Sequence, residues 1–188
     1  MSGPKVADAT RLQLHLLVLR CQAGDERAFG RLMEQFGRRT LAYLRGLTGE
    51  DAEDVQQDVW VTVYRNIGGL SNPDAFRTWL FRTTRHRAID WLRRRKRERE
   101  LIEDVALEMP VGGATAEPYD MAELSEARFA AVTAGLPPPQ REVLLLRYRD
   151  DLSYEEIALV VGCPIGTVRT RLHHAKRRLQ EQLERGVT

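Results

Sequence analysis

Apolar residues recur at helical spacing along most of the chain. The clearest stripe joins five positions on one side of a helix that we predict to begin near Asp51: Ala52, Val55, Val59, Val63 and Ile67. A similar stripe at Ala28, Leu32 and Phe36 predicts a preceding helix that ends near Leu47. These two stripes indicate helices that each bury one face.

Residues 12–19 fit two periods. Leu12, Leu14 and Leu16 alternate as in a strand, whereas Leu12, Leu16 and Leu19 share one face of a helix. No strand-like segment follows, so we predict a helix here as well. The pattern as a whole predicts an all-α fold.

Turn and capping signals divide the remaining chain. Gly68 and Gly69 end one helix, and Asn72 is a predicted N-cap with Pro73 in the first turn of the next. Farther along, a helix over 140–148 follows three prolines. Ser153 and Glu156 then form a predicted capping box before a short helix.

A second, longer helix over 166–184 follows that short one. Gly162 supplies the left-handed residue that ends the short helix at Val161, and Cys163 and Pro164 form the turn. This spacing is typical of a helix-turn-helix, whose second helix enters the DNA major groove. A helix-turn-helix used only for protein contact is the alternative.

Charge is arranged in blocks that the net charge of +2 conceals. Residues 76–97 hold nine Lys or Arg against one Asp, residues 98–127 hold nine Asp or Glu against one Arg, and residues 163–188 hold six basic and two acidic residues. Two basic blocks in helical segments indicate two surfaces for a polyanion, or else two solvated helix faces.

The Gly- and Pro-rich residues 109–118 lack periodicity, as linkers do. We therefore predict an N-terminal extension over 1–23, a helical domain over 24–97, an acidic linker over 98–118 and a helix-turn-helix domain over 119–185. Each of these small domains is expected to be a helical bundle.

Several classes of protein are excluded by what the sequence lacks. No apolar run approaches the ~20 residues of a membrane span, so we expect no membrane insertion and a cytoplasmic protein. Cys21 and Cys163 are too far apart for a metal motif. A zinc site from Cys163 with His173 and His174 is disfavoured, because adjacent helical residues point about 100° apart. With no catalytic triad, paired carboxylates or phosphate loop, we predict no enzyme, no cofactor and no metal.

Two helix faces are candidate binding surfaces. Opposite the buried stripe of the helix at 51–67 lie Asp54, Gln57, Asp58 and Val61, which form either a docking face or a solvated surface. The next helix intersperses Trp79 and Trp91 among arginines, and such aromatics either stack on unpaired bases or pack in the core.

Three segments together resemble a known family. They are DAEDVQQDVWVTVYRNI (51–67), FRTWLFRTTRHRAIDWLRRRKR (76–97) and LPPPQREVLLLRYRDDLSYEEIALVVGCPIGTVRTRLHHAKRRL (136–179). In this order they resemble bacterial sigma factors of the extracytoplasmic-function (ECF) group, which retain only the sigma-2 and sigma-4 domains. The resemblance implies an alternative sigma factor that binds core RNA polymerase, through the clamp helices of its largest subunit and its flap, and directs it to promoter DNA.

The resemblance also implies roles for residues. Implied to bind polymerase are Asp51, Asp54, Gln57, Asp58 and Val61. Implied to open the −10 element and capture a flipped base are Asn66, Ser71, Asn72, Phe76, Arg77, Trp79, Arg82, Arg85 and His86. Implied to read the −35 duplex are Gly166, Thr167, Arg169, Thr170, Arg171, His173, His174, Lys176 and Arg177.

Relatives of this kind are often held inactive by an anti-sigma factor, which is therefore an expected partner. By the same analogy the acidic linker would lie near the polymerase active site, where its charge could mimic RNA. The chain departs from the family at His86, where Asn is common, at Thr170, where Ser is usual, and at the His173-His174 pair. A stand-alone helix-turn-helix regulator is the main alternative, and a nuclease or helicase fragment is a weaker one.

Overall fold

The computed structural model describes residues 4–103, 133 and 135–185, which contain helices and no strand. The α-helices are α1 (Pro4–Gln22), α2 (Glu26–Thr48), α3 (Ala52–Asn66), α4 (Phe76–Glu103), α6 (Pro138–Tyr148), α7 (Tyr154–Val161) and α8 (Ile165–Arg185). Short 3₁₀ turns are η1 (Gly49–Asp51), η2 (Ile67–Gly69) and η3 (Pro73–Ala75). The all-α fold is confirmed, and α4 continues beyond the boundary predicted at residue 97. The rest of the predicted linker lies outside the described residues.

The N-terminal helices surround one hydrophobic core. All five residues of the stripe predicted for α3 are buried in it, together with Leu32 and Phe36 of α2. The Phe36 ring meets the Phe76 ring edge-on, with centroids 5.5 Å apart. Asp25 starts α2 by accepting a hydrogen bond from the Ala28 backbone N–H at 3.0 Å.

Helix α1 forms as predicted, but it buries a different face from the one that suggested it. Leu12, Leu16 and Leu19 are exposed, whereas Val18 and Cys21 are buried, with Leu14 and Leu17 packed against the same core. The leucine-rich segment offers apolar residues on both sides, so periodicity alone did not decide which side faces α2.

The C-terminal helices form the predicted helix-turn-helix. The Ser153 Oγ accepts from the Glu156 N–H at 3.1 Å, and the Glu156 carboxylate accepts from the Ser153 N–H at 2.7 Å, which completes the capping box. Gly162 adopts the left-handed conformation (φ 69°, ψ 42°) that ends α7. Val168 and Leu172 of α8 are buried.

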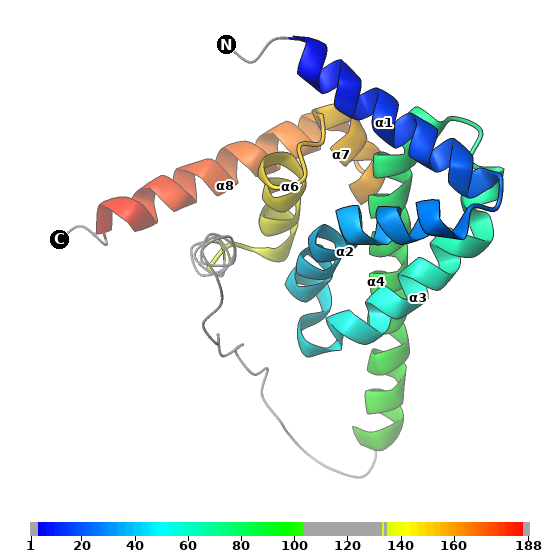
Figure 1. Cartoon of the computed structure of the whole chain (residues 1–188). Helices are drawn as coiled ribbons and strands as arrows, with labels where there is room; N and C mark the ends of the chain where they lie inside the picture. The colour runs from blue at the N-terminus through cyan, green and yellow to red at the C-terminus, as the bar shows by residue number, and fades with distance from the viewer. Residues whose placement is uncertain (1–3, 104–132, 134, 186–188) are drawn as a thin grey trace.

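The two halves of the chain share a hydrophobic cluster. Tyr43 of α2 and Phe81 of α4 pack edge-on with ring centroids 5.6 Å apart, within the cluster formed by Leu144, Ile157 and other C-terminal residues. Helix α4 packs against α2, α3 and α7, and α6 packs against α2. Figure 1 shows α3 and α6 on opposite sides of α2 and α4. A Cβ on Gly46 would lie 3.2 Å from Leu145 Cδ1, so glycine permits α2 to approach α6 this closely.

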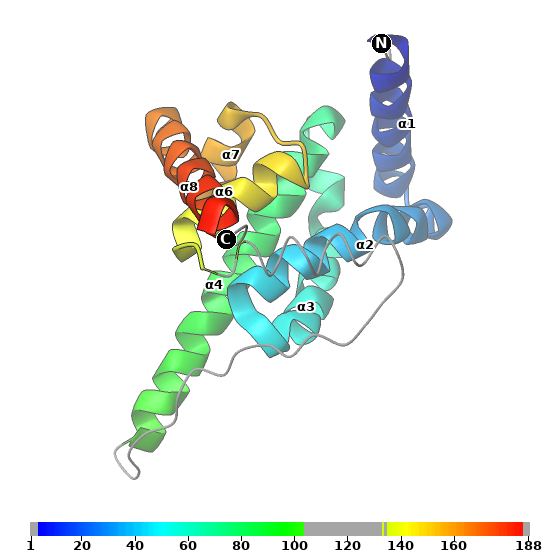
Figure 2. The ribbon, with the colours of Figure 1, turned by 90° about the vertical axis from the view of Figure 1, so that its left-hand side faces the viewer.

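Two ends of the fold project from this shared core. Figure 2 shows the C-terminal end of α4 extending beyond the other helices, and Figure 1 shows α8 extending in another direction. Helix α8 and residues 93–97 of α4 come from the basic blocks of the sequence, whereas residues 98–103 of α4 belong to the acidic block. The fold therefore presents its positive charge on exposed helices.

Candidate nucleic-acid and protein-binding surfaces

The predicted acidic face lies on the outer side of α3. Asp54, Gln57 and Val61 are exposed there. Asp58 is paired with Arg94 of α4 at 3.9 Å, and Asp51, before the start of α3, forms an ion pair with Arg95 of α4. Two of the acidic groups predicted to bind polymerase therefore also pair with arginines of α4.

A groove beside this face extends the surface onto α2. Its lining includes Gln57 and Val61 of α3 and Met33, Glu34 and Arg38 of α2. The predicted face did not include the α2 residues, because Met33 lies at helical spacing from Phe36 and is therefore difficult to distinguish from a core residue by sequence. The exposed fractions of Met33 (40%) and Val61 (48%) show an apolar surface open to a partner.

Trp60 and Phe76 are core residues rather than surface groups. Trp60 stands next to Val61 in the sequence, yet only 6% of it is exposed, and its ring meets Phe29 edge-on. Phe76, which was expected to contact DNA, is fully buried. Trp79 is half-buried and packs beside Phe76, with ring centroids 6.1 Å apart. The aromatics of the basic helix therefore serve mainly to seat it on the bundle.

The exposed basic residues of α4 lie on the side away from that core. Arg82 and His86 are exposed, as expected for residues that meet a nucleic acid. Arg77 and Arg85 instead face the C-terminal helices. Arg77 donates to the Asp150 backbone carbonyl, and Arg85 Nε donates to Glu142 Oε1 at 2.8 Å.

Glu142 is the centre of a buried polar contact between the two halves. Its Oε1 also accepts a hydrogen bond from the Tyr43 hydroxyl at 2.7 Å, and 6% of the residue is exposed. Burial, and then the negative charge of Glu142, raise the pKa of Tyr43 well above its usual value. Tyr43 therefore stays a neutral donor, and Arg85 supplies the charge that Glu142 needs in this site.

Two further hydrogen bonds connect the two halves. The Thr78 hydroxyl donates to Glu156 Oε1 at 3.0 Å, and Arg149 donates to the Arg39 backbone carbonyl at 3.0 Å. These bonds join the N-terminal bundle to the helix-turn-helix. In this arrangement Arg77 and Arg85, which were expected to meet the −10 element, are engaged in contacts between the two halves.

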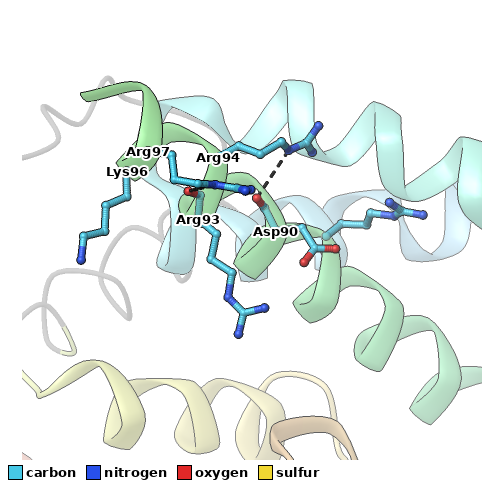
Figure 3. Close-up of a pocket in the computed structure, with 6 residues that line it drawn as sticks. Asp90, Arg93, Arg94, Lys96 and Arg97 are labelled. Atoms are coloured by element: carbon cyan, nitrogen blue, oxygen red, sulfur yellow. Dashed lines mark hydrogen bonds between the residues drawn. The ribbon is translucent and has the colours of Figure 1, made fainter. Parts of the chain in front are cut away.

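The end of α4 carries a basic surface that the residue-by-residue prediction did not include. Figure 3 shows the side chains of Arg93, Arg94 and Lys96 extending from the helix in different directions around Asp90. Arg94 also lies over the Trp91 ring, 5.8 Å from its centroid. Exposed cations in successive helical turns are suited to following a phosphate backbone.

The loop over 66–74 joins α3 to α4 through η2 and η3. Ser71 and Asn72 are exposed, and Asn72 Oδ1 accepts from the Asp74 N–H at 3.0 Å, which confirms Asn72 as a cap. A Cβ on Gly68 or Gly69 would meet no atom within 4 Å. The outer surface of this loop is therefore open to a ligand.

The recognition face of the helix-turn-helix is largely exposed. The exposed members of the predicted set are Gly166, Arg169, Thr170, His173, Lys176 and Arg177, and Thr167, Arg171 and His174 are half-buried. Arg171 Nη1 lies 3.8 Å from Cys163 Sγ as a hydrogen-bond donor, and Lys176 Nζ is 5.3 Å from the Tyr148 ring centroid. Arg169 is therefore better placed than Arg171 for reaching a base edge.

The described part of the chain contains no cluster of three His, Cys, Asp or Glu residues that could hold a metal ion. None of its helices is long and apolar enough to cross a membrane.

The described residues combine an exposed acidic and apolar helix face, a basic helix beside an open loop, and a helix-turn-helix. In the family comparison, the Sigma-70 region 2 family matches residues 32–98 and the Sigma-70 region 4 family matches residues 126–179. The chain belongs to the ECF sigma factors. It is 31% identical over 179 residues to the ECF RNA polymerase sigma-E factor of Escherichia coli K12, covering 90% of this chain and 93% of that protein.

Other relatives agree with this assignment. The sigma-E factor of Haemophilus influenzae is 30% identical over 193 residues, which cover 94% of this chain and 98% of that protein. Among solved structures, CnrH in complex with the cytosolic domain of CnrY superposes with a TM-score of 0.62 at 26% identity, covering 91% of this chain and 97% of that one. Sigma factor RpoE in complex with the anti-sigma factor NepR from Bartonella quintana gives 0.61 at 27% identity, with coverages of 83% and 96%.

Proposed function

We propose that this alternative sigma factor binds core RNA polymerase through the outer face of α3 and the adjoining groove on α2. Exposed apolar side chains beside Asp54, Gln57 and Asp58 support this, because docking sites commonly combine an apolar centre with charged edges. Asp51 would act mainly by fixing α3 to α4, since its carboxylate is paired with Arg95. Promoter selection follows from this docking, and the flap of the polymerase would hold the C-terminal domain.

Two surfaces of the protein would then recognise the two promoter elements. The N-terminal part of α8 would enter the major groove of the −35 duplex, with Arg169 at a base edge and Lys176 and Arg177 at phosphates. The open loop at 66–74 and the exposed side of α4, with Arg82 and His86, would hold the melted −10 strand. Extruding a base costs a few kcal/mol, which contacts in that loop must offset.

The two halves must separate before both surfaces act together. Arg77 and Arg85 become available to the −10 strand only when they leave Asp150 and Glu142. Binding to polymerase supplies the free energy for this change if the enzyme engages the two halves at separate places. An anti-sigma factor, as seen bound to RpoE, would oppose it by holding the two halves together.

The protein carries out no reaction of its own in this proposal, and it acts in the cytoplasm, where the polymerase and the promoters are. The observation that carries the proposal is the presence, in one chain, of an intact helix-turn-helix and an open loop next to a basic helix. A stand-alone regulator needs only the helix-turn-helix.

In vitro transcription tests the proposal directly. Purified protein, core polymerase of the source bacterium and a randomised promoter library would be combined, and the transcripts sequenced. We expect transcripts that start at a fixed distance from a two-part motif. Tight duplex binding by the free protein with no factor-dependent transcript would instead establish the stand-alone regulator.

A further inference from the structure

Helix α1 precedes both matched family segments, yet it contacts the open loop at 66–74 near both of its ends. We propose that α1 is a positioning element for this loop, and that Gln22 is its principal residue. This inference rests on the proposed role of the loop in capturing a −10 base. The inference adds that helix α1, outside the loop, determines how precisely the loop captures the base.

Gln22 anchors the first part of the loop. Its side-chain Nε2 donates to the Ile67 carbonyl at 3.0 Å and to the Leu70 carbonyl at 2.7 Å, and the contact is partly buried. The Leu70 N–H also bonds to the Ile67 carbonyl at 3.1 Å, which closes the turn η2. One amide group therefore uses both of its hydrogens to fix the two carbonyls that bracket Gly68 and Gly69.

Arg11 and His15 anchor the last part. Arg11 Nη2 lies 2.7 Å from Asp74 Oδ2, and His15 Nδ1 lies 2.9 Å from Asp74 Oδ1. The carboxylate sits next to the loop that would approach a DNA strand, where an uncompensated negative charge would repel phosphate. The contacts from α1 both hold Asp74 in place and offset its charge.

Apolar contacts set the depth of the loop on the bundle. Val18 and Cys21 of α1 belong to the same buried cluster as Ile67, and Leu70 packs against it. Gly68 and Gly69, between Ile67 and Leu70, remain exposed, and so does Ser71 directly after Leu70. The loop is thus fixed on either side of its open centre, which reduces the conformational entropy that would be lost when a base binds.

The test compares Gln22→Glu and Gln22→Ala with the same changes at Gln13, an exposed residue of the same helix. Each variant is loaded on core polymerase and given the randomised promoter library. The Gln22→Glu change places a carboxylate against two carbonyl oxygens at unchanged size. We expect it to lower the preference for the −10 half of the motif about tenfold, with the −35 half unchanged. The Gln13 variants should match the wild type.

Alkylation of Cys21 distinguishes a positioning role of Gln22 from a general loss of the docked helix α1. Burial raises the pKa of this thiol to about 11, and the residue is 8% exposed, so it should react slowly while α1 is docked. We expect Cys21 to stay protected in both Gln22 variants, as read by mass spectrometry after iodoacetamide treatment. Unchanged −10 preference in both variants overturns the proposal.

Two other outcomes are decisive as well. If Cys21 becomes reactive in both Gln22 variants, the residue has a structural role only and the positioning role is rejected. If the wild type gives no factor-dependent transcripts while its fold is intact, the proposed function itself fails, and the role of α1 fails with it. The wild-type control thus distinguishes the two failures.

Discussion

Arg85 of α4 and Glu142 of α6 form an ion pair, with 2.8 Å between Nε and Oε1, although 57 positions separate them in the sequence. The pair joins a residue expected to meet the −10 element to the helix that precedes the helix-turn-helix. Because the side chain of Glu142 is 7% exposed, the pair is shielded from solvent on the acidic side. Its state therefore reports whether the two halves of the protein are together.

Glu142→Gln should loosen this contact. The amide keeps the size of the side chain but removes the charge that Arg85 faces, so we expect the free energy of unfolding to fall by about 1–3 kcal/mol. Urea denaturation measures the loss, and fluorescence transfer between dyes on the two halves measures their separation. Glu50→Gln, at an exposed position of η1, is the control. An unchanged distance and stability would show that the pair does not hold the halves together.

Asp54→Arg combined with Asp58→Arg should abolish binding to core polymerase and leave the fold intact. The two substitutions reverse the charge of the outer face of α3, and the Asp58 change also places a cation beside Arg94. Binding is measured by native gel shift with core polymerase, and folding by circular dichroism. Gln180→Arg with Glu181→Arg, on the exposed part of α8, gives a similar charge change elsewhere. Equal affinity of both double variants would reject the docking face.

Arg169→Ala and Arg177→Ala should differ in their effect on −35 recognition. Arg169 lies near the start of α8, where base contacts are made, so its loss should cost about 1–3 kcal/mol at one base pair and relax the preference there. Arg177 lies two turns later, so its loss should weaken binding to all sequences. It should also reduce the slope of log affinity against log salt concentration by about 1. Titration of each protein variant with −35 duplexes of varied sequence, at several salt concentrations, distinguishes these outcomes. If both substitutions weaken binding equally on all sequences, Arg169 contacts phosphate instead of a base.

Gly162→Ala and Gly166→Ala should have opposite effects on stability. Gly162 has φ 69°, where a side chain is strained, so alanine should lower the free energy of unfolding by about 1–2 kcal/mol. Gly166 is within α8, and a Cβ there meets no atom within 4 Å, so alanine should raise stability by about 0.5–1 kcal/mol. Thermal denaturation of both variants measures the difference, and equal effects would contradict the left-handed cap.

Asp74→Asn should remove a contribution to stability that depends on pH. Hydrogen bonds from Arg11, and then from His15, lower the pKa of Asp74 from 3.8 to about 2. A carboxylate with a lowered pKa stabilises the fold above pH 3.8, and that contribution is lost as the pH falls from 3.8 towards 2. The melting temperatures of wild type and variant should therefore differ at neutral pH and converge across this range. A constant difference down to pH 2 would show that the charge of Asp74 is not involved.

Local features of this fold could be read from the sequence, and long-range ones could not. The capping box at Ser153 and Glu156 and the left-handed Gly162 depend on residues within one turn, so the sequence contains all that determines them. The contact of Tyr43 with Glu142 joins positions 99 apart, and each residue looks like an ordinary surface or core residue of its own helix. No local pattern distinguishes such a pair.

The candidate sites also combine local features, which the sequence predicts, with long-range contacts, which it does not. The residues predicted to share the outer face of α3 and those predicted at the start of α8 lie largely exposed on those helices, because helical periodicity determines which residues share a face. Phe76 was misplaced, because an aromatic residue among arginines fits either stacking on bases or packing, and the choice depends on Phe36 of another helix. The packing of α1 against the loop was missed because Gln22 and Asp74 carry no motif.

The two oxygens of Glu156 have separate partners, and this determines how the protein can change shape. Oε2 caps the first turn of α7 through the Ser153 N–H, whereas Oε1 accepts the bond from Thr78 in the other half. Of these two bonds of Glu156, separation of the halves breaks only the one to Thr78, and the cap of α7 is retained. We therefore expect the helix-turn-helix to move as a unit and to present the same shape to the duplex before and after the two halves separate.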